Sequence, residues 1–112
     1  MSDPTAPYLP LTPVAFEILL CLATGEKHGY AILREIEQRT EGRLGLHAGS
    51  LYRAMARLVE EGLLVTVEAP ADELDRRRRY YAVTDLGRAV ARAEALRLRT
   101  QLEAARGAEL LG

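Results

Sequence analysis

The chain has 112 residues, 48% of them hydrophobic, and a formal net charge of −1. This length predicts one small domain with a modest core, for which pairing of two chains would add stability. The near-zero charge excludes a uniformly basic protein, so any nucleic-acid binding must depend on local positive charge. With no signal peptide, no membrane-spanning run and a single cysteine, Cys21, the sequence predicts a protein of the reducing cytoplasm.

The first residues predict a flexible arm followed by a helix. Residues 1–11 carry three prolines, each of which fixes φ and lacks a backbone donor. Thr12 and Pro13 then match the N-cap and first position of a helix that we expect to run to about residue 24. This helix is hydrophobic on nearly every side, so we expect its opposite faces to be covered by different partners. We assign Phe16 and Leu20 to a dimer interface.

Two further helices are predicted before the pattern changes. Residues 28–39 form the first of them, and a turn with two glycines separates it from the second, at residues 48–61. In the second helix, hydrophobic residues recur from Leu51 to Leu58 at the i, i+3, i+4 and i+7 positions of one face. Gly62 provides the left-handed stop after this helix.

A hairpin follows, with a charged tip between two short strands. Residues 63–69 and 78–84 alternate with the period of a strand, with Val65 and Tyr81 on the inward side. The arginines Arg76–Arg79 fall at the tip and in the second strand. Alternation along a strand would send successive arginines of this run to opposite faces.

The last predicted helix begins near residue 84 and continues to about residue 106. Its hydrophobic face rotates by roughly 120° partway along the helix, which indicates two different contacts. We expect the first half to pack on its own domain and the second half, with Leu98 and Leu102, to pack on a partner subunit. The predicted division is therefore an arm at 1–11, a compact domain at 12–84 and a dimerisation helix at 85–112.

This order of elements predicts a mainly α fold with a small β-hairpin, the winged helix-turn-helix, extended by a long C-terminal dimerisation helix. The major groove of DNA admits one α-helix, whose outer face reads base edges, and a basic wing beside it grips phosphate. Small residues on the third helix allow a close approach, while its hydroxyl and guanidinium groups donate hydrogen bonds. The candidate DNA-binding residues are His47, Gly49, Ser50, Tyr52, Arg53 and Arg57 in the recognition helix and Arg76, Arg77, Arg78 and Arg79 in the wing.

Three segments resemble the PadR family of bacterial transcriptional regulators. They are "HGY" at 28–30, "GSLYRAMARLVEEGLL" at 49–64 and "RRRRYYAVTDLGR" at 76–88, and the resemblance covers about residues 12–90. The short C-terminal part is similar to the small subgroup with one dimerisation helix. The resemblance implies a homodimer, a palindromic operator on double-stranded DNA, and repression relieved by a small molecule that we expect between the first and last helices.

The chain departs from the family pattern at three positions. Met55 stands where leucine is usual, which is a mild change in the core. Arg53 stands where proline is frequent and adds a positive contact. His47 stands where a small hydroxyl residue often caps the helix, so this histidine either weakens the cap or contacts DNA itself.

Other interpretations of the same residues stay open. The arginine run is also typical of a solvated surface, and Arg57 has Glu60 or Glu61 within reach for pairing along its own helix. We expect Tyr30 and Tyr81 in the core, whereas Tyr52 fits a core or a contact position equally well.

The sequence predicts no enzyme, no cofactor and no metal site. The histidines lie far from Cys21 and from each other, without the spacing of metal ligands, and neither a nucleophile elbow nor a phosphate-binding glycine loop is present. Two alternative functions are a winged-helix module that binds proteins instead of DNA and a related DNA-binding family with a different signal.

Overall fold

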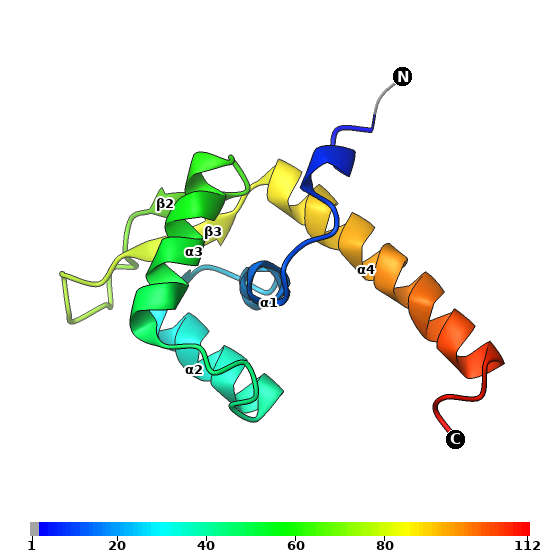
Figure 1. The fold of residues 1–112 in the computed structure, drawn as a ribbon. Helices are drawn as coiled ribbons and strands as arrows, with labels where there is room; N and C mark the ends of the chain where they lie inside the picture. The colour runs from blue at the N-terminus through cyan, green and yellow to red at the C-terminus, as the bar shows by residue number, and fades with distance from the viewer. Residues whose placement is uncertain (1–2) are drawn as a thin grey trace.

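The computed structural model describes residues 3–112, so Met1 and Ser2 of the predicted arm lie outside the described residues. All four predicted helices are present, and the mainly α fold with a small antiparallel sheet is confirmed (Figure 1). In chain order the elements are η1 (Ala6–Tyr8), α1 (Pro13–Leu22), β1 (Lys27–His28), α2 (Gly29–Thr40), α3 (Ala48–Glu60), β2 (Leu64–Val67), β3 (Tyr80–Val83) and α4 (Asp85–Gly107).

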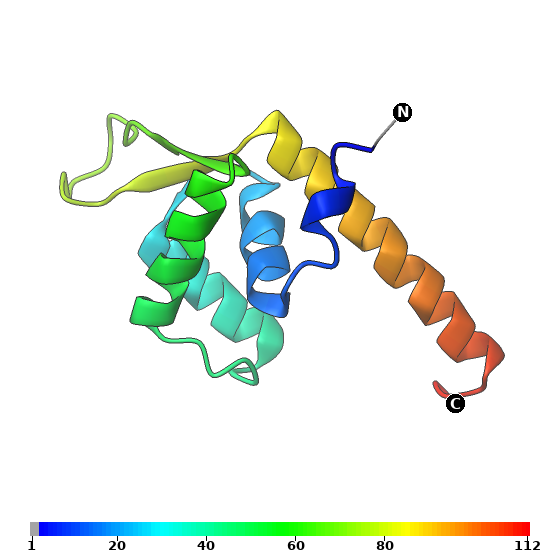
Figure 2. The same cartoon turned by 45° about the horizontal axis from the view of Figure 1, so that its top comes forward.

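Helix α1 lies at the centre of the molecule. It contacts α2, α3, α4 and β3, so its own chain covers most of its surface (Figure 2). Ile18, Leu19 and Leu22 are buried, whereas Phe16 and Leu20 stay partly exposed. A helix this hydrophobic requires cover on all sides. The two residues assigned to the dimer interface thus keep surface for a further contact.

The sheet has three strands instead of the two predicted. Its order is β1-β3-β2, with both pairs antiparallel. Strand β1 has only two residues, paired as Lys27 with Tyr81 and His28 with Tyr80. A two-residue strand is too short to show any alternation of hydrophobic and polar residues, so it could not be predicted from the pattern. Its pairing places His28 and the start of α2 beside the wing.

The expected inward position of Val65 is wrong. Val65 is 45% exposed, and its neighbour Leu64 is buried instead. The reason lies in the stop after α3, where Gly62 adopts a φ of 81° and the Leu63 N–H donates to the carbonyl of Leu58. Leu63 therefore belongs to the helix end, and β2 begins at Leu64, whose side chain is buried while those of Val65 and Thr66 are exposed. The inward position of Tyr81, which is 5% exposed, is confirmed.

Helix α4 packs on the domain only over its first half. Val90 is fully buried, and Gly87 lies so close to Leu63, the residue before β2, that a Cβ at this position would be 2.1 Å from the Leu63 carbonyl oxygen. The second half projects away from the other elements in both views, and Leu98 and Leu102 are 36% and 43% exposed (Figures 1 and 2). Among residues 3–112, no helix combines the length and the hydrophobicity that a membrane crossing requires.

Candidate nucleic-acid interface

The N-terminus of α3 is capped by His47 and Ser50. The His47 Nδ1 accepts from the Ser50 N–H at 3.3 Å, and the Ser50 Oγ accepts from the His47 N–H at 3.2 Å while donating to the His47 carbonyl at 2.9 Å. This is the reciprocal pattern of a capping box, with histidine as the first member. His47 thus caps the helix fully, and the hydroxyl proton of Ser50 is already used within the cap.

The outer face of α3 presents small and basic side chains. Leu51, Met55 and Leu58 are buried and fix the inner face, while Tyr52 and Arg53 are exposed. Gly49 is also exposed, as are Ala56 and Arg57 further along this face. The expected pairing of Arg57 along its own helix is present, because its Nε lies 3.2 Å from a carboxylate oxygen of Glu61. Among residues 3–112, Arg53 forms no ion pair.

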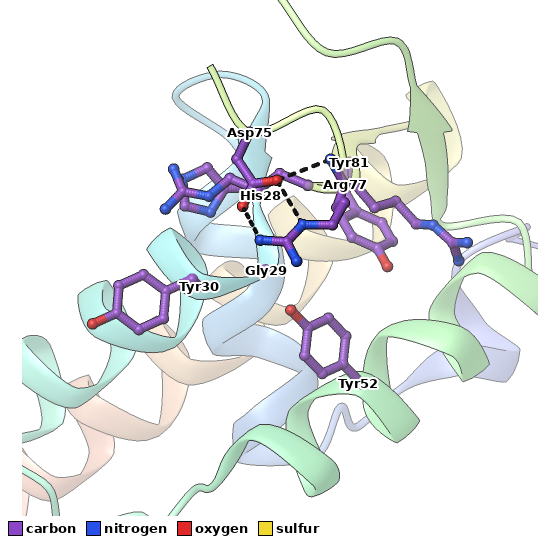
Figure 3. Close-up of a pocket in the computed structure, with 9 residues that line it drawn as sticks. His28, Gly29, Tyr30, Tyr52, Asp75, Arg77 and Tyr81 are labelled. Carbon is purple, nitrogen blue, oxygen red and sulfur yellow. Dashed lines mark hydrogen bonds and ion pairs between the residues drawn. The ribbon is translucent and has the colours of Figure 1, made fainter. Parts of the chain in front are cut away.

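Tyr52 and Gly29 form a close contact between α3 and the start of α2. A Cβ at Gly29 would lie 2.5 Å from the Tyr52 hydroxyl oxygen, so only glycine leaves room for the tyrosine in this position. Tyr52 is 47% exposed, and its hydroxyl points into a depression of about 510 Å³ below the wing (Figure 3). The contact therefore sets where Tyr52 stands relative to the wing.

Tyr30 is exposed, so its expected place in the core is wrong. It is 56% exposed on α2 and lines the same depression as Tyr52. The Arg34 guanidinium lies 5.8 Å from the centre of its ring, a distance at which a cation is attracted to the aromatic face. Ile32 and Ile36 occupy the buried face of α2, and Tyr30, two positions before Ile32, lies on a different face of the helix.

The wing brings three of its four arginines to this depression, which Arg77, Arg78 and Arg79 line together with Tyr52. They precede β3 instead of lying within it, so the expected alternation of the run across two strand faces is wrong. The segment makes its own turn, in which the Arg78 N–H donates to the Asp75 carbonyl at 3.1 Å. This turn comes just before β3, which begins at Tyr80 and has four residues.

Acidic residues of the wing hold two of these arginines. The Asp75 carboxylate accepts from the Arg77 Nε at 3.1 Å, as the dashed lines in Figure 3 show, and this pairing lowers the pKa of Asp75. Glu73, almost buried, accepts from the Tyr80 hydroxyl at 2.5 Å and pairs with Arg78 at 3.5 Å. The Tyr80 hydroxyl is the main reason why the pKa of Glu73 is lowered.

Arg76 and Arg79 have no acidic partner among residues 3–112. The Arg76 guanidinium donates to the carbonyl oxygens of Pro70 and Glu73, which leaves its charge uncompensated. Arg76 does not line the depression, whereas Arg79 does. The four wing arginines are therefore of two kinds, two paired with carboxylates and two with a free charge.

His28 joins the wing to α2. Its Nδ1 accepts from the Ala31 N–H at 3.1 Å and caps α2, so this nitrogen carries no proton and the neutral ring is protonated at Nε2. The Nε2 lies 3.3 Å from an Arg78 nitrogen, which cannot donate to it in this tautomer. Burial, and then the charge of Arg78, lower the pKa of His28. Neither His28 nor Tyr30 was among the predicted site residues, because only the unpredicted strand β1 brings them to the wing.

The structure brings only some of the predicted interface residues together. Tyr52 and three of the four wing arginines meet at one depression, Arg53 and Arg57 line a second depression on the other flank of α3, and Leu98 and Leu102 lie on the projecting part of α4. No group of three or more potential metal ligands occurs within the part of the chain that the structure describes.

Comparisons with known proteins agree with this architecture. The family model for the transcriptional regulator PadR-like family matches residues 18–93. The chain is 41% identical over 78 residues to an uncharacterized 37.1 kDa protein in transposon TN4556 of Streptomyces fradiae. That match covers 70% of this chain but 21% of the relative, so the chain spans about a fifth of the length of that protein.

Solved structures share the fold over nearly the whole chain. A PadR family transcription regulator from Clostridium difficile superposes with a TM-score of 0.77 at 22% identity, over 90% of this chain and 100% of that one. A transcriptional regulator from Clostridium thermocellum gives 0.68 at 23% identity, over 96% and 95% of the two chains. RosR of H. salinarum gives 0.62 at 28% identity, over 93% and 97%. With the family model matching more than half of its length, the chain belongs to the PadR-like family of transcriptional regulators.

Proposed function

We propose that this chain is a sequence-specific transcriptional repressor that binds a palindromic operator as a homodimer. In each protomer, α3 enters the major groove, where Tyr52, Arg53 and Arg57 reach base edges or phosphates. The wing grips the adjacent backbone through Arg76 and Arg79, with Arg77 and Arg78 in support. The observation that carries this proposal is the outer face of α3, which is small and basic beside a depression lined by wing arginines.

The proposed dimer is built by α1 and α4. The partly exposed Phe16 and Leu20 on α1 and the exposed Leu98 and Leu102 on α4 are hydrophobic surface that a second chain would bury. Fully burying an exposed side chain of this size contributes roughly 1.5–3 kcal/mol, and each of these partly buried side chains would contribute less than half of that. An arm at 1–11, a DNA-binding domain at 12–84 and a dimerisation helix at 85–112 remain the proposed division, and an effector between α1 and α4 would change the separation of the two α3 helices.

The test is DNA binding by charge-matched variants. Fluorescence anisotropy would compare the wild type with Arg53→Ala/Arg57→Ala on the duplex upstream of the coding region and on a mixed-sequence duplex. The control is Arg92→Ala/Arg99→Ala, which removes the same charge from α4. We expect the α3 variant to lose both affinity and the preference for the upstream duplex, by about 1–3 kcal/mol per base contact, and the control to keep them.

Two results would contradict the proposal. Equal losses in the α3 and α4 variants would mean that only overall charge matters. A folded dimer that does not bind DNA saturably at low salt would favour the alternative function, a winged-helix module that binds proteins. The wing arginines that are paired with carboxylates are also compatible with that alternative.

A further inference from the structure

A second depression lies between the N-terminal arm and the flank of α3. It has a volume of about 420 Å³ and does not share residues with the depression under the wing. Pro7, Tyr8 and Pro10 of the arm form one wall, and Arg53 and Arg57 of α3 form the opposite rim. Its volume falls within the range of roughly 300–1,000 Å³ that is usual for small-molecule sites.

The arm wall is fixed at two points. At one, the Leu11 N–H donates to the carboxylate of Glu94 on α4 at 3.1 Å. Glu94 is 2% exposed and is also held by Arg97, with a nearest contact of 2.5 Å. At the other, the Tyr8 hydroxyl donates to the carbonyl of Glu61 at the end of α3. The arm thus lies against the first half of α4 in both ribbon views (Figures 1 and 2). Its residues line one side of the depression.

Hydrophobic side chains from α1 and α3 also line this depression. We call Ala15 of α1 with Ala54 and Leu58 of α3 its floor, in which two of the three side chains are single methyl groups, and Leu11 and Leu63 line the depression as well. The proline rings and the Tyr8 ring of the arm stand beside this floor. Such a slot accommodates a flat hydrophobic body, which would bury area against both α3 and the arm.

The rim carries one uncompensated positive charge. Glu61 also lines the depression, but its carboxylate is paired with Arg57 at 3.2 Å. Arg53 has no ion-pair partner among residues 3–112 and so is available to an anion. A guanidinium binds carboxylate, sulfonate or phosphate oxygens through two parallel N–H donors. Shape and charge together select a small organic anion with a flat, hydrophobic body.

We propose that this slot between the arm and α3 binds such an anion and that the bound ligand competes with DNA for Arg53. The ligand would bind the guanidinium of Arg53 and lie against the flank of α3, the helix that enters the major groove. Binding of the anion does not depend on the proposed function, whereas its effect on DNA does. The site is separate from the effector position between α1 and α4. Among the residues that line the slot, Ala15 is the one that belongs to α1, and none belongs to α4.

The direct test uses two fluorescent probes in the absence of DNA. Anilinonaphthalene sulfonate has two flat ring systems and one negative charge, and phenylnaphthylamine has the same rings without the sulfonate. Full-length protein would be titrated with each probe, and we expect one saturable site per chain. Arg53→Gln should lower the affinity for the sulfonate probe by up to about fivefold, which is the contribution of an exposed ion pair. The affinity for the neutral probe should not change.

A second pair of variants locates the site. Ala15→Phe places a ring on the floor and should abolish binding of both probes, whereas Ala23→Phe adds the same ring at the exposed end of α1, outside the slot, and should preserve it. Circular dichroism would show whether each variant is folded. If Ala15→Phe does not fold, the site is tested by the Arg53→Gln variant alone, which should lose affinity for the sulfonate probe and keep its affinity for the neutral probe. Absence of saturable binding, or probe binding that neither variant alters, would overturn the proposal.

Competition with DNA is measured separately by anisotropy at saturating sulfonate probe. We expect the dissociation constant for the duplex to rise several-fold in the wild type and to be unaffected by the probe in Ala15→Phe. Binding of the probe without any change in DNA affinity would leave the site in place and refute the competition. Absence of DNA binding under all conditions would refute the proposed function and leave the probe result valid.

Discussion

Neutralising the free arginines of the wing should weaken DNA binding more than removing a paired one. Arg77 already donates to both carboxylate oxygens of Asp75, at 3.1 and 3.4 Å. Arg76 donates only to backbone carbonyls, and Arg79 forms no ion pair among residues 3–112. We therefore expect Arg76 and Arg79 to supply the phosphate contacts of the wing.

The magnitude follows from the charges of the wing. Between residues 68 and 79, four acidic residues face four arginines, so the segment has no net charge. Each cation that neutralises a phosphate of duplex DNA contributes about 0.9 to the slope of log affinity against log salt. Arg76→Ala/Arg79→Ala should make this slope shallower by about two. Arg77→Ala/Asp75→Asn removes a neutral ion pair and should leave the slope unchanged. Asp75→Asn alone frees the charge of Arg77 and should make the slope steeper by about one.

The assay is fluorescence anisotropy of a labelled mixed-sequence duplex over a salt series, with the fold of each variant checked by circular dichroism. Asparagine at 75 keeps the oxygen that accepts from the Arg77 N–H, so the turn of the wing is preserved in these variants. A slope that becomes shallower by one or more in Arg77→Ala/Asp75→Asn would contradict this prediction, because Arg77 would then exchange the Asp75 carboxylate for a phosphate when DNA binds.

Three further predictions concern stability. Gly87→Ala should lower Tm by about ten degrees, because its Cβ would lie 2.1 Å from the Leu63 carbonyl oxygen and cost about 2 kcal/mol of stability. Gly107→Ala should leave Tm unchanged, because nothing lies within 4 Å of a Cβ there. Equal Tm values for the two variants would contradict this prediction. Because burial lowers the pKa of His28, this side chain is protonated in the unfolded state before it is protonated in the folded state as the pH falls, and the free energy of unfolding should decrease between about pH 7 and pH 5. Urea titrations should show a smaller decrease in His28→Asn, whose side chain can still cap α2. An equal decrease in both proteins would exclude His28 as the cause. Glu94→Gln should speed hydrogen exchange at the Leu11 N–H, which donates to the Glu94 carboxylate, because a charged carboxylate accepts more strongly than an amide oxygen. The pKa of Glu94 is lowered chiefly by Arg97, so the carboxylate is charged at neutral pH. An unchanged exchange rate would show that this charge does not hold the arm.

The helices were predictable because each has its own local signals. The Thr12 side chain accepts from the Ala15 N–H at 3.1 Å, as expected of an N-cap, and Gly62 ends α3 with a positive φ. The buried stripe from Leu51 to Leu58 matches its helical spacing. Local patterns of this kind do not depend on how distant segments meet.

The details of the candidate interface depend on distant contacts, and here prediction was weaker. Strand β1 pairs only through β3, about fifty residues further along the chain, and this pairing brings His28 beside Arg78 of the wing. Glu94 is buried although the helix pattern places a charge there, because the arm supplies a backbone donor to it. The partners of the wing arginines are also set by the fold of the loop, which the order of charges along the sequence does not specify.

The most direct test of the account is the stoichiometry and footprint of the protein on its operator. Sedimentation of the complex with the upstream duplex would give the number of chains, and hydroxyl-radical footprinting would locate them. Two chains per duplex, with two symmetric protected half-sites about one helical turn apart, would agree with a dimer that places one α3 in each of two successive major grooves. One chain per duplex, or a folded dimer that protects no site, would contradict the account.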